Sequence, residues 1–149
     1  VGTADPSDMD DCIRLLEAGP WDELISGGPV LLNPTFGEPS RRVGGADADM
    51  ICGNRVIDFK VMKQVAPREI LRQLVGHLIL AREARCAAPS FPEITELVTY
   101  YARRRHVDVI QASRFTDHPR FEEACGWFWA RADRLFGGTT GSRVDRLEL

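Results

Sequence analysis

The sequence has no long apolar segment and no paired cysteines, and both absences exclude classes of protein. No apolar run approaches the roughly 18 residues of a transmembrane helix, so we do not expect this chain to be an integral membrane protein. The four cysteines, Cys12, Cys52, Cys86 and Cys125, are far apart and form no C-x-x-C pair. That spacing is typical neither of a zinc site nor of a disulfide framework. We therefore expect reduced thiols in a cytoplasmic protein without a signal peptide.

Lysine is also scarce. Lys60 and Lys63 are the only lysines among the 19 basic residues, and the others are arginines. The formal net charge of -3 argues against a protein that coats DNA through a general positive surface, although an enzyme needs only a local one. Arginine does not replace lysine where a compact ammonium is needed, so two lysines three residues apart single out this stretch.

Length and periodicity predict one α/β domain over residues 1–136, followed by a flexible tail over 137–149. A chain of 149 residues can bury a core without disulfides. The predicted order α-β-β-β-α-β-β-α describes a mixed sheet with helices packed against it. The predicted segments are a helix over 8–18 capped by Asp8 or Asp10, a strand over 30–36, a loop over 37–42, a hairpin over 44–63, a helix over 67–84, strands over 94–102 and 107–115, and a helix over 119–136.

Gly53-Asn54 is a favourable two-residue hairpin turn, and it fixes a register. Counting outward from it, Cys52 faces Arg55 and Asp49 faces Asp58. Side chains alternate along a strand, so one face of the hairpin carries the polar group and the other forms a core face. The polar group is Asp47, Asp49, Asp58 and Lys60, and the core face is Ala48, Met50, Ile57 and Phe59.

Two carboxylates opposite each other repel, and a divalent cation between them removes the repulsion. Oxygen ligands of this kind suit Mg²⁺, with Mn²⁺ able to substitute. Lys60 would place an ammonium beside the metal, where it stabilises developing negative charge or orients a water. The alternative is a solvent-facing strand, on which Asp47 and Lys60 form a surface ion pair of little worth.

The hairpin resembles the D…(D/E)-x-K core of the PD-(D/E)XK nuclease superfamily. The resemblance lies in Gly45-Ala46-Asp47-Ala48-Asp49-Met50-Ile51 and Val56-Ile57-Asp58-Phe59-Lys60. The helical segment Leu71–His77 is similar to the Gln motif of the RecB-like branch, with His77 where that branch has Tyr. The superfamily's restriction-endonuclease-like core has the order α-β-β-β-α-β, and here an extra strand and a C-terminal helix would follow it.

The resemblance implies a role for each matching residue. Asp49 and Asp58 would hold the metal, Lys60 would be the catalytic lysine, and Gln73 would orient the lysine, the water or a phosphate. A further metal ligand is expected from the first helix, with Glu17 preferred to Glu23.

Other polar and aromatic residues are candidates for contact with nucleic acid. Arginine suits phosphate recognition, and tryptophan can stack on bases. Each candidate has a structural alternative, namely a solvated turn for the arginines and core packing for the histidine and the tryptophans. The candidates are Arg41, Arg42, Lys63, His77, Arg103, Arg104, Arg105, Trp21, Trp127 and Trp129.

The sequence therefore predicts a Mg²⁺-dependent nuclease that acts on nucleic acid, with DNA the expected substrate. Two alternatives stay open. One is a nuclease-fold module without turnover that binds nucleic acid or a protein partner, and the other is an unrelated α/β domain whose acidic hairpin faces solvent. A homodimer or a partner protein is compatible with each of them.

Overall fold

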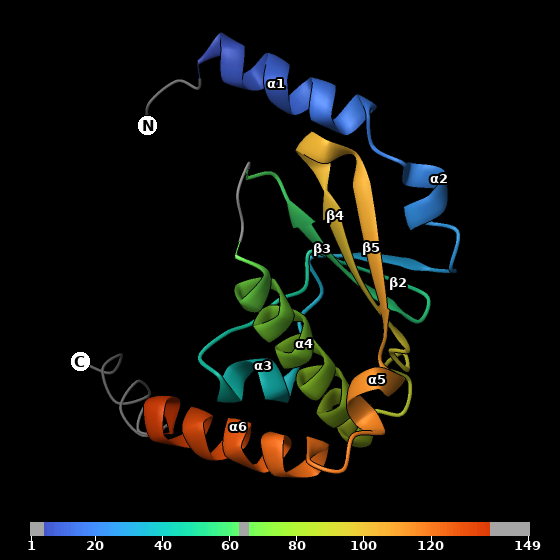
Figure 1. The fold of residues 1–149 in the computed structure, drawn as a ribbon. Helices are drawn as coiled ribbons and strands as arrows, with labels where there is room; N and C mark the ends of the chain where they lie inside the picture. The colour runs from blue at the N-terminus through green and yellow to red at the C-terminus, as the bar shows by residue number, and fades with distance from the viewer. Residues whose placement is uncertain (1–4, 63–65, 138–149) are drawn as a thin grey trace, which may run out of the picture.

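The computed structural model describes residues 5–62 and 66–137 (Figure 1). The described chain contains five strands, six α-helices and one short 3₁₀ turn. They are α1 (Pro6–Glu17), α2 (Trp21–Leu24), β1 (Val30–Leu32), α3 (Glu38–Arg42), β2 (Met50–Cys52), β3 (Arg55–Lys60), α4 (Pro67–Ala87), β4 (Glu96–Tyr101), η1 (Ala102–Arg104), β5 (His106–Gln111), α5 (Ser113–Thr116) and α6 (Phe121–Phe136). Lys63 and the predicted tail beyond Gly137 lie outside these residues.

The strands form one mixed sheet in the order β1-β2-β3-β4-β5. Only β3 and β4 run parallel, and the long helix α4 makes the crossover that a parallel pair requires. The other neighbours are antiparallel. The prediction of a mixed sheet with helices against it is confirmed.

Helices cover both faces of this sheet. On one face, α4 supplies Leu74 and Leu78 to a core that includes Val56 of β3 and Phe121 of α6. On the other face, Leu15 of α1 and the segment from Trp21 to Leu24 pack against Met50, Ile57 and Tyr100. Figure 1 shows α1 across one end of the sheet and α6 beyond the other, with α4 between them.

The hairpin has the predicted register, because Cys52 pairs with Arg55 and Met50 pairs with Ile57. Its turn has a positive φ of 57° at Gly53, a conformation that glycine adopts without steric cost. The expectation of a single core face is wrong. Ile51 and Val56, on the face predicted to be polar, are also buried, since the α4 crossover covers that face.

Other differences have local causes. The cap of α1 is Asp5, whose side chain accepts from Ser7 N–H, and not Asp8 or Asp10. Residues 38–42 are helical instead of looped, because a proline in the first turn is preset for a helix. The strand predicted over 107–115 ends at Gln111, where the chain turns into α5. Leu71 shares the helical spacing of the buried Leu74 and Leu78, which predicts a place on the apolar face of α4, but it is 41% exposed.

None of the helices within the described ranges has the length and apolar character needed to cross a bilayer.

We predict opposite effects for alanine at two glycines. A Cβ at Gly53 would overlap the carbonyl oxygen of Gly27, and the positive φ adds strain, so Gly53→Ala should lower the free energy of unfolding by at least about 1 kcal/mol. Gly126 lies inside α6 with open space around its Cβ position, so Gly126→Ala should raise it by about 0.5–1 kcal/mol. Urea unfolding measures both. A neutral Gly53→Ala would contradict the close approach of the turn to Gly27.

Candidate active site

Four residues predicted to be catalytic meet at one end of the β2–β3 hairpin. Asp58 and Lys60 are alternate residues of β3 and therefore share a face. Lys60 Nζ lies 2.6 Å from Asp58 Oδ2 and donates a 2.8 Å hydrogen bond to Oε1 of Gln73 on α4. Asp49, directly before β2, accepts a 2.7 Å hydrogen bond from Phe59 N–H. The hairpin and α4 thus gather two carboxylates, one ammonium and one amide.

Asp58 is a buried carboxylate. Its exposed fraction is 1%, and its Oδ1 has no hydrogen-bond partner among the described residues. Burial raises the pKa of Asp58; the ion pair with Lys60 opposes this effect, and the negative charge of Asp49 adds to it. The reading of a solvent-facing hairpin does not hold at Asp58. A buried oxygen without a partner is costly and is typical of a functional site.

Lys60 is held from two sides. Asp58 pairs with the Lys60 ammonium, and Gln73 fixes the direction of the ammonium. The Lys60 side chain is 16% exposed. An ammonium has three N–H donors, so one donor direction remains beyond these two partners. That direction is available to a phosphate oxygen or a water.

His77 lies one helical turn beyond Gln73, but it points into the core. Its exposed fraction is 6%, its ring packs 5.5 Å from that of Phe36, and its buried Nδ1 has no hydrogen-bond partner among the described residues. Burial lowers its pKa, which favours the neutral imidazole. This position fits a packing residue beneath the site and not the surface phosphate contact that we expected.

The expected ligand from the first helix is not brought to the aspartates. Glu17 is exposed near the end of α1, which covers the opposite sheet face from Asp58. Glu23 is the alternative ligand, and its backbone oxygen accepts a hydrogen bond from Arg55. Across residues 5–62 and 66–137, no three or more Asp, Glu, His or Cys side chains gather as a metal site. Asp49 and Asp58 remain as a pair.

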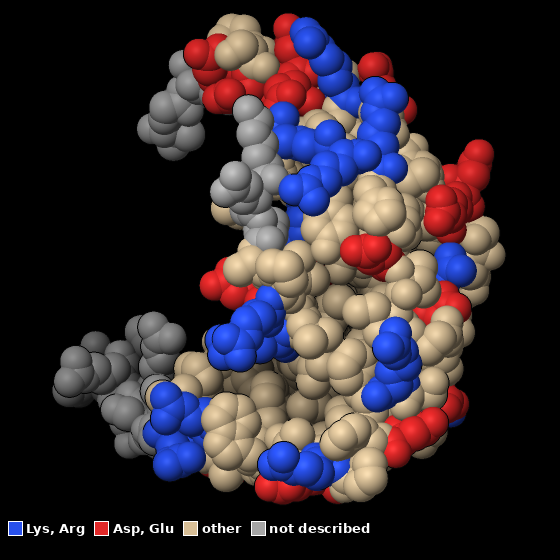
Figure 2. Space-filling model, viewed as in Figure 1, with Lys and Arg blue, Asp and Glu red and all other residues tan. Residues whose placement is uncertain are grey.

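Two of the arginines expected to contact phosphate, Arg41 and Arg42, are paired with carboxylates of the protein. Arg41 pairs with Glu38 on the same helix. Arg42 makes two 2.8 Å bonds to Asp133 and lies 4.4 Å over the ring of Trp129, which fastens α3 to α6. Figure 2 shows basic side chains gathered below α1, where Figure 1 places the β4–β5 turn that carries Arg103–Arg105.

The tryptophans divide between packing and exposure. Trp129 is covered by Arg42, and Trp21 packs on Phe59 and Tyr100. Trp127 is 66% exposed. It stands at a hollow of about 620 Å³ between α4, α5 and α6.

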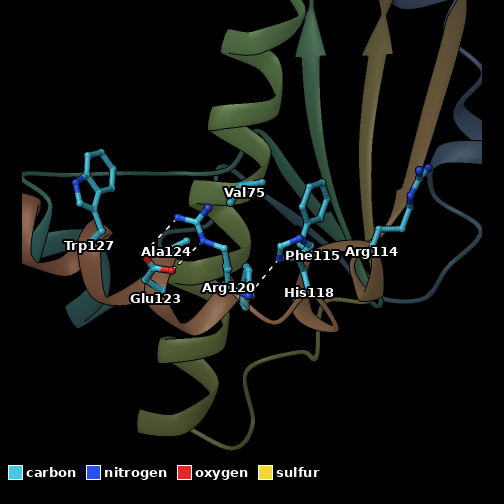
Figure 3. Close-up of a pocket in the computed structure, with 9 residues that line it drawn as sticks. Val75, Arg114, Phe115, His118, Arg120, Glu123, Ala124 and Trp127 are labelled. Carbon is cyan, nitrogen blue, oxygen red and sulfur yellow. Dashed lines mark hydrogen bonds and ion pairs between the residues drawn. The ribbon is translucent and has the colours of Figure 1, made fainter.

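This hollow is lined by charged residues that sequence reasoning missed. Figure 3 shows Arg114 and His118 from the α5 region and Arg120 bound to Glu123 at the start of α6. These residues surround one hollow because the chain turns after Gln111. The sequence analysis predicted that the strand would continue to residue 115. The exposed tryptophan was the one available signal.

Comparison with known proteins gives no match: no family model, no curated protein and no solved structure matches this chain. The likeness to the PD-(D/E)XK superfamily remains a resemblance of motif and element order. The chemistry of the site therefore has to be argued from its own residues.

We predict that Asp58→Asn stabilises the protein above acidic pH. Because burial raises the pKa of Asp58, the unfolded chain ionises at a lower pH than the folded one. Wild type therefore loses stability as pH rises through this interval, whereas Asn does not ionise. Urea unfolding in EDTA measures the free energy of unfolding. The increase that Asp58→Asn causes should be absent at low pH, grow as pH rises, and level off above the pKa of Asp58 in the folded protein.

Asp133→Asn is the matched control. Arg42 lowers the pKa of Asp133, so this carboxylate stabilises the fold above its unfolded pKa and the stabilisation is lost as pH falls. Asp133→Asn should therefore destabilise at neutral pH and have no effect at low pH. The same sign of effect in both variants at neutral pH would refute our account of Asp58.

Proposed function

We propose that this protein is a metal-dependent nuclease that hydrolyses phosphodiester bonds, with DNA the expected substrate. One observation carries the proposal: Lys60 is held between a buried aspartate and Gln73, with a second aspartate across the hairpin. Each of these side chains matches a residue of the D…DxK and Gln motifs that the sequence resembles. A chance cluster of surface charges would not place a carboxylate in the core at a free-energy cost.

The observed order of elements supports the same proposal. Before the C-terminal additions, helix α1 is followed by the antiparallel strands β1, β2 and β3, then by the α4 crossover and the parallel strand β4. This agrees with the α-β-β-β-α-β order of a restriction-endonuclease-like core, with α2 and α3 as short insertions. Strand β5 and helix α6 correspond to the extra strand and the C-terminal helix.

The two carboxylates fit a magnesium ion. Mg²⁺ keeps several waters and is commonly bound through one or two carboxylates together with substrate phosphate, so a third protein ligand is not required. Asp58 Oδ1 is buried and has no partner within the described chain, and a cation would satisfy it. Asp49 and Asp58 would hold the metal, which when bound lowers the pKa of a coordinated water and stabilises charge on the phosphate.

The chain's own residues complete the chemistry. In hydrolysis a water loses a proton as its oxygen bonds to phosphorus, the P–O ester bond breaks, and the leaving oxygen takes up a proton. Negative charge grows on the phosphoryl oxygens, and Lys60 places a positive charge where it develops. Gln73 is a positioning residue that keeps the ammonium directed at the phosphate through its 2.8 Å hydrogen bond.

A binding module without turnover is the second candidate. The hollow beside the exposed Trp127 favours it, because Arg114, His118 and a free indole ring offer phosphate contact and base stacking. This surface contains none of the four residues of the Lys60 site. A pure binding module would therefore keep its affinity for nucleic acid when Lys60 is removed and would cleave nothing.

We predict that Lys60→Ala lowers kcat for nucleic-acid cleavage by about 10²–10³, the usual loss when one charge-stabilising group is removed. The assay uses plasmid, linear duplex, single-stranded DNA and RNA with Mg²⁺, Mn²⁺ or EDTA. Arg131→Ala, which removes an exposed positive charge on α6, is the control and should keep full activity. Equal cleavage by wild type and Lys60→Ala would refute the mechanism, and binding without cleavage in any metal would favour the second candidate.

A further inference from the structure

A second concave surface lies on the sheet face opposite α4. It is a groove of about 740 Å³ between α1 and the sheet. Leu15 and Leu16 of α1 form one wall, and Leu32 of β1, which is 72% exposed, forms part of the rim. The groove contains none of Lys60, Asp58 and Gln73, and its lining is almost entirely apolar.

Three aromatic rings line the apolar interior of the groove. Trp21, Phe59 and Tyr100 all line it and contact one another edge to face, with ring centroids 6.0 to 6.5 Å apart. Rings held in this way are fixed in orientation and offer faces and edges to a planar ligand. Nucleobases are planar, and their stacking on aromatic side chains tolerates any base sequence.

Three of the lining residues, Tyr100, Asn33 and Asp49, carry a polar oxygen on the side chain. The hydroxyl of Tyr100 is buried and has no hydrogen-bond partner in the part of the chain that the structure describes, while the residue is 2% exposed. A buried hydroxyl without a partner is costly, and a ligand with a polar edge would remove the cost. Asn33 has an exposed side chain with donor and acceptor groups, which match the edge of a base.

The groove is continuous with the candidate active site through Asp49. This residue lines the groove, and its backbone oxygen accepts a 3.0 Å hydrogen bond from Asn33 N–H. Its Oδ2 is bound to Phe59 N–H, one residue from Asp58. A ligand in the groove therefore lies next to Asp49, one of the two candidate metal ligands.

We propose that the groove binds one unpaired nucleobase of the strand being cut, next to the phosphate at the Asp49–Asp58 site. This inference rests on the proposed nuclease function and narrows its substrate to single-stranded or locally unpaired nucleic acid. A base inside a duplex is paired and stacked on both sides, so it cannot enter an aromatic groove without first leaving the helix.

Charge supports the entry of a base and not of the phosphate backbone. The outer wall of the groove is α1, which carries Asp8, Asp10 and Glu17, whereas Asp11 is paired with Arg103. Figure 2 shows acidic side chains at the α1 end of the molecule, with basic side chains directly below them. Acidic side chains repel phosphate, whereas a neutral base loses little by leaving water for an apolar slot. The backbone would remain on the Lys60 side.

The test measures binding in a Lys60→Ala background, where cleavage does not interfere. Fluorescence anisotropy compares a labelled single-stranded oligonucleotide with the blunt duplex of the same sequence in Mg²⁺. The single strand should bind at least tenfold more tightly than the duplex. Leu32→Trp, which fills the groove from its rim, should remove most of this preference.

Two further variants control this result. Leu31→Trp adds the same ring at the neighbouring position of β1, whose side chain points to the other sheet face, and should leave the preference intact. Tyr100→Phe removes only the unpartnered hydroxyl, so it should weaken single-strand binding severalfold without lowering the free energy of unfolding.

The outcomes separate this inference from the function on which it rests. If wild type cleaves nucleic acid but Leu32→Trp and Tyr100→Phe leave single-strand and duplex binding unchanged, the nuclease proposal stands and the base-binding groove is wrong. The groove would then hold another occupant, such as an apolar segment of a protein. If wild type neither binds nor cleaves any nucleic acid, both proposals fail together.

Discussion

The candidate site depends on the burial of one carboxylate. Asp58 lies in β3, the central strand, with β2 on one side, β4 on the other and helices over both faces. Water is excluded from this position, so the ionised form depends on neighbouring groups for stabilisation. Lys60 supplies the counter-charge, and Gln73 holds Lys60. Oδ1 of Asp58 still has no partner in the described structure, and this remaining deficit is what a bound cation would satisfy.

The β3–α4–β4 crossover gives the two sheet faces different chemistry. On the α4 side, Gln73 reaches Lys60 beside Asp58, so this face carries the polar groups at the strand ends. On the other side, α1 stands over aromatic rings and leaves an apolar groove. Asp49 belongs to both regions, because it precedes β2 where the chain passes the edge of the groove. The proposed active site and the apolar groove therefore adjoin at Asp49.

Local signals predicted the hairpin well and the distant contacts poorly. A two-residue turn with a leading glycine determines which residues face each other, so the register around Gly53 and the approach of Asp49 to Asp58 follow from spacing alone. The length and period of α4 likewise predicted the helix that brings Gln73 to Lys60. The burial of Ile51 and His77 depends on which face α4 covers, and no pattern within the hairpin records that. The distance of Glu17 from the site has the same origin, since α1 packs on the other face.

The contacts of Lys60 show why lysine, and not arginine, suits this position. Arginine in this protein fastens parts of the fold together: the planar fork of Arg42 binds both oxygens of Asp133, and that of Arg103 binds both oxygens of Asp11. A fork at position 60 would bind both oxygens of Asp58 in the same way and leave none for a metal. The single nitrogen of Lys60 contacts one oxygen, leaves Oδ1 open, and directs a second donor to Gln73. In the proposed metal site, a compact ammonium would therefore pair with Asp58 and leave Oδ1 for the metal.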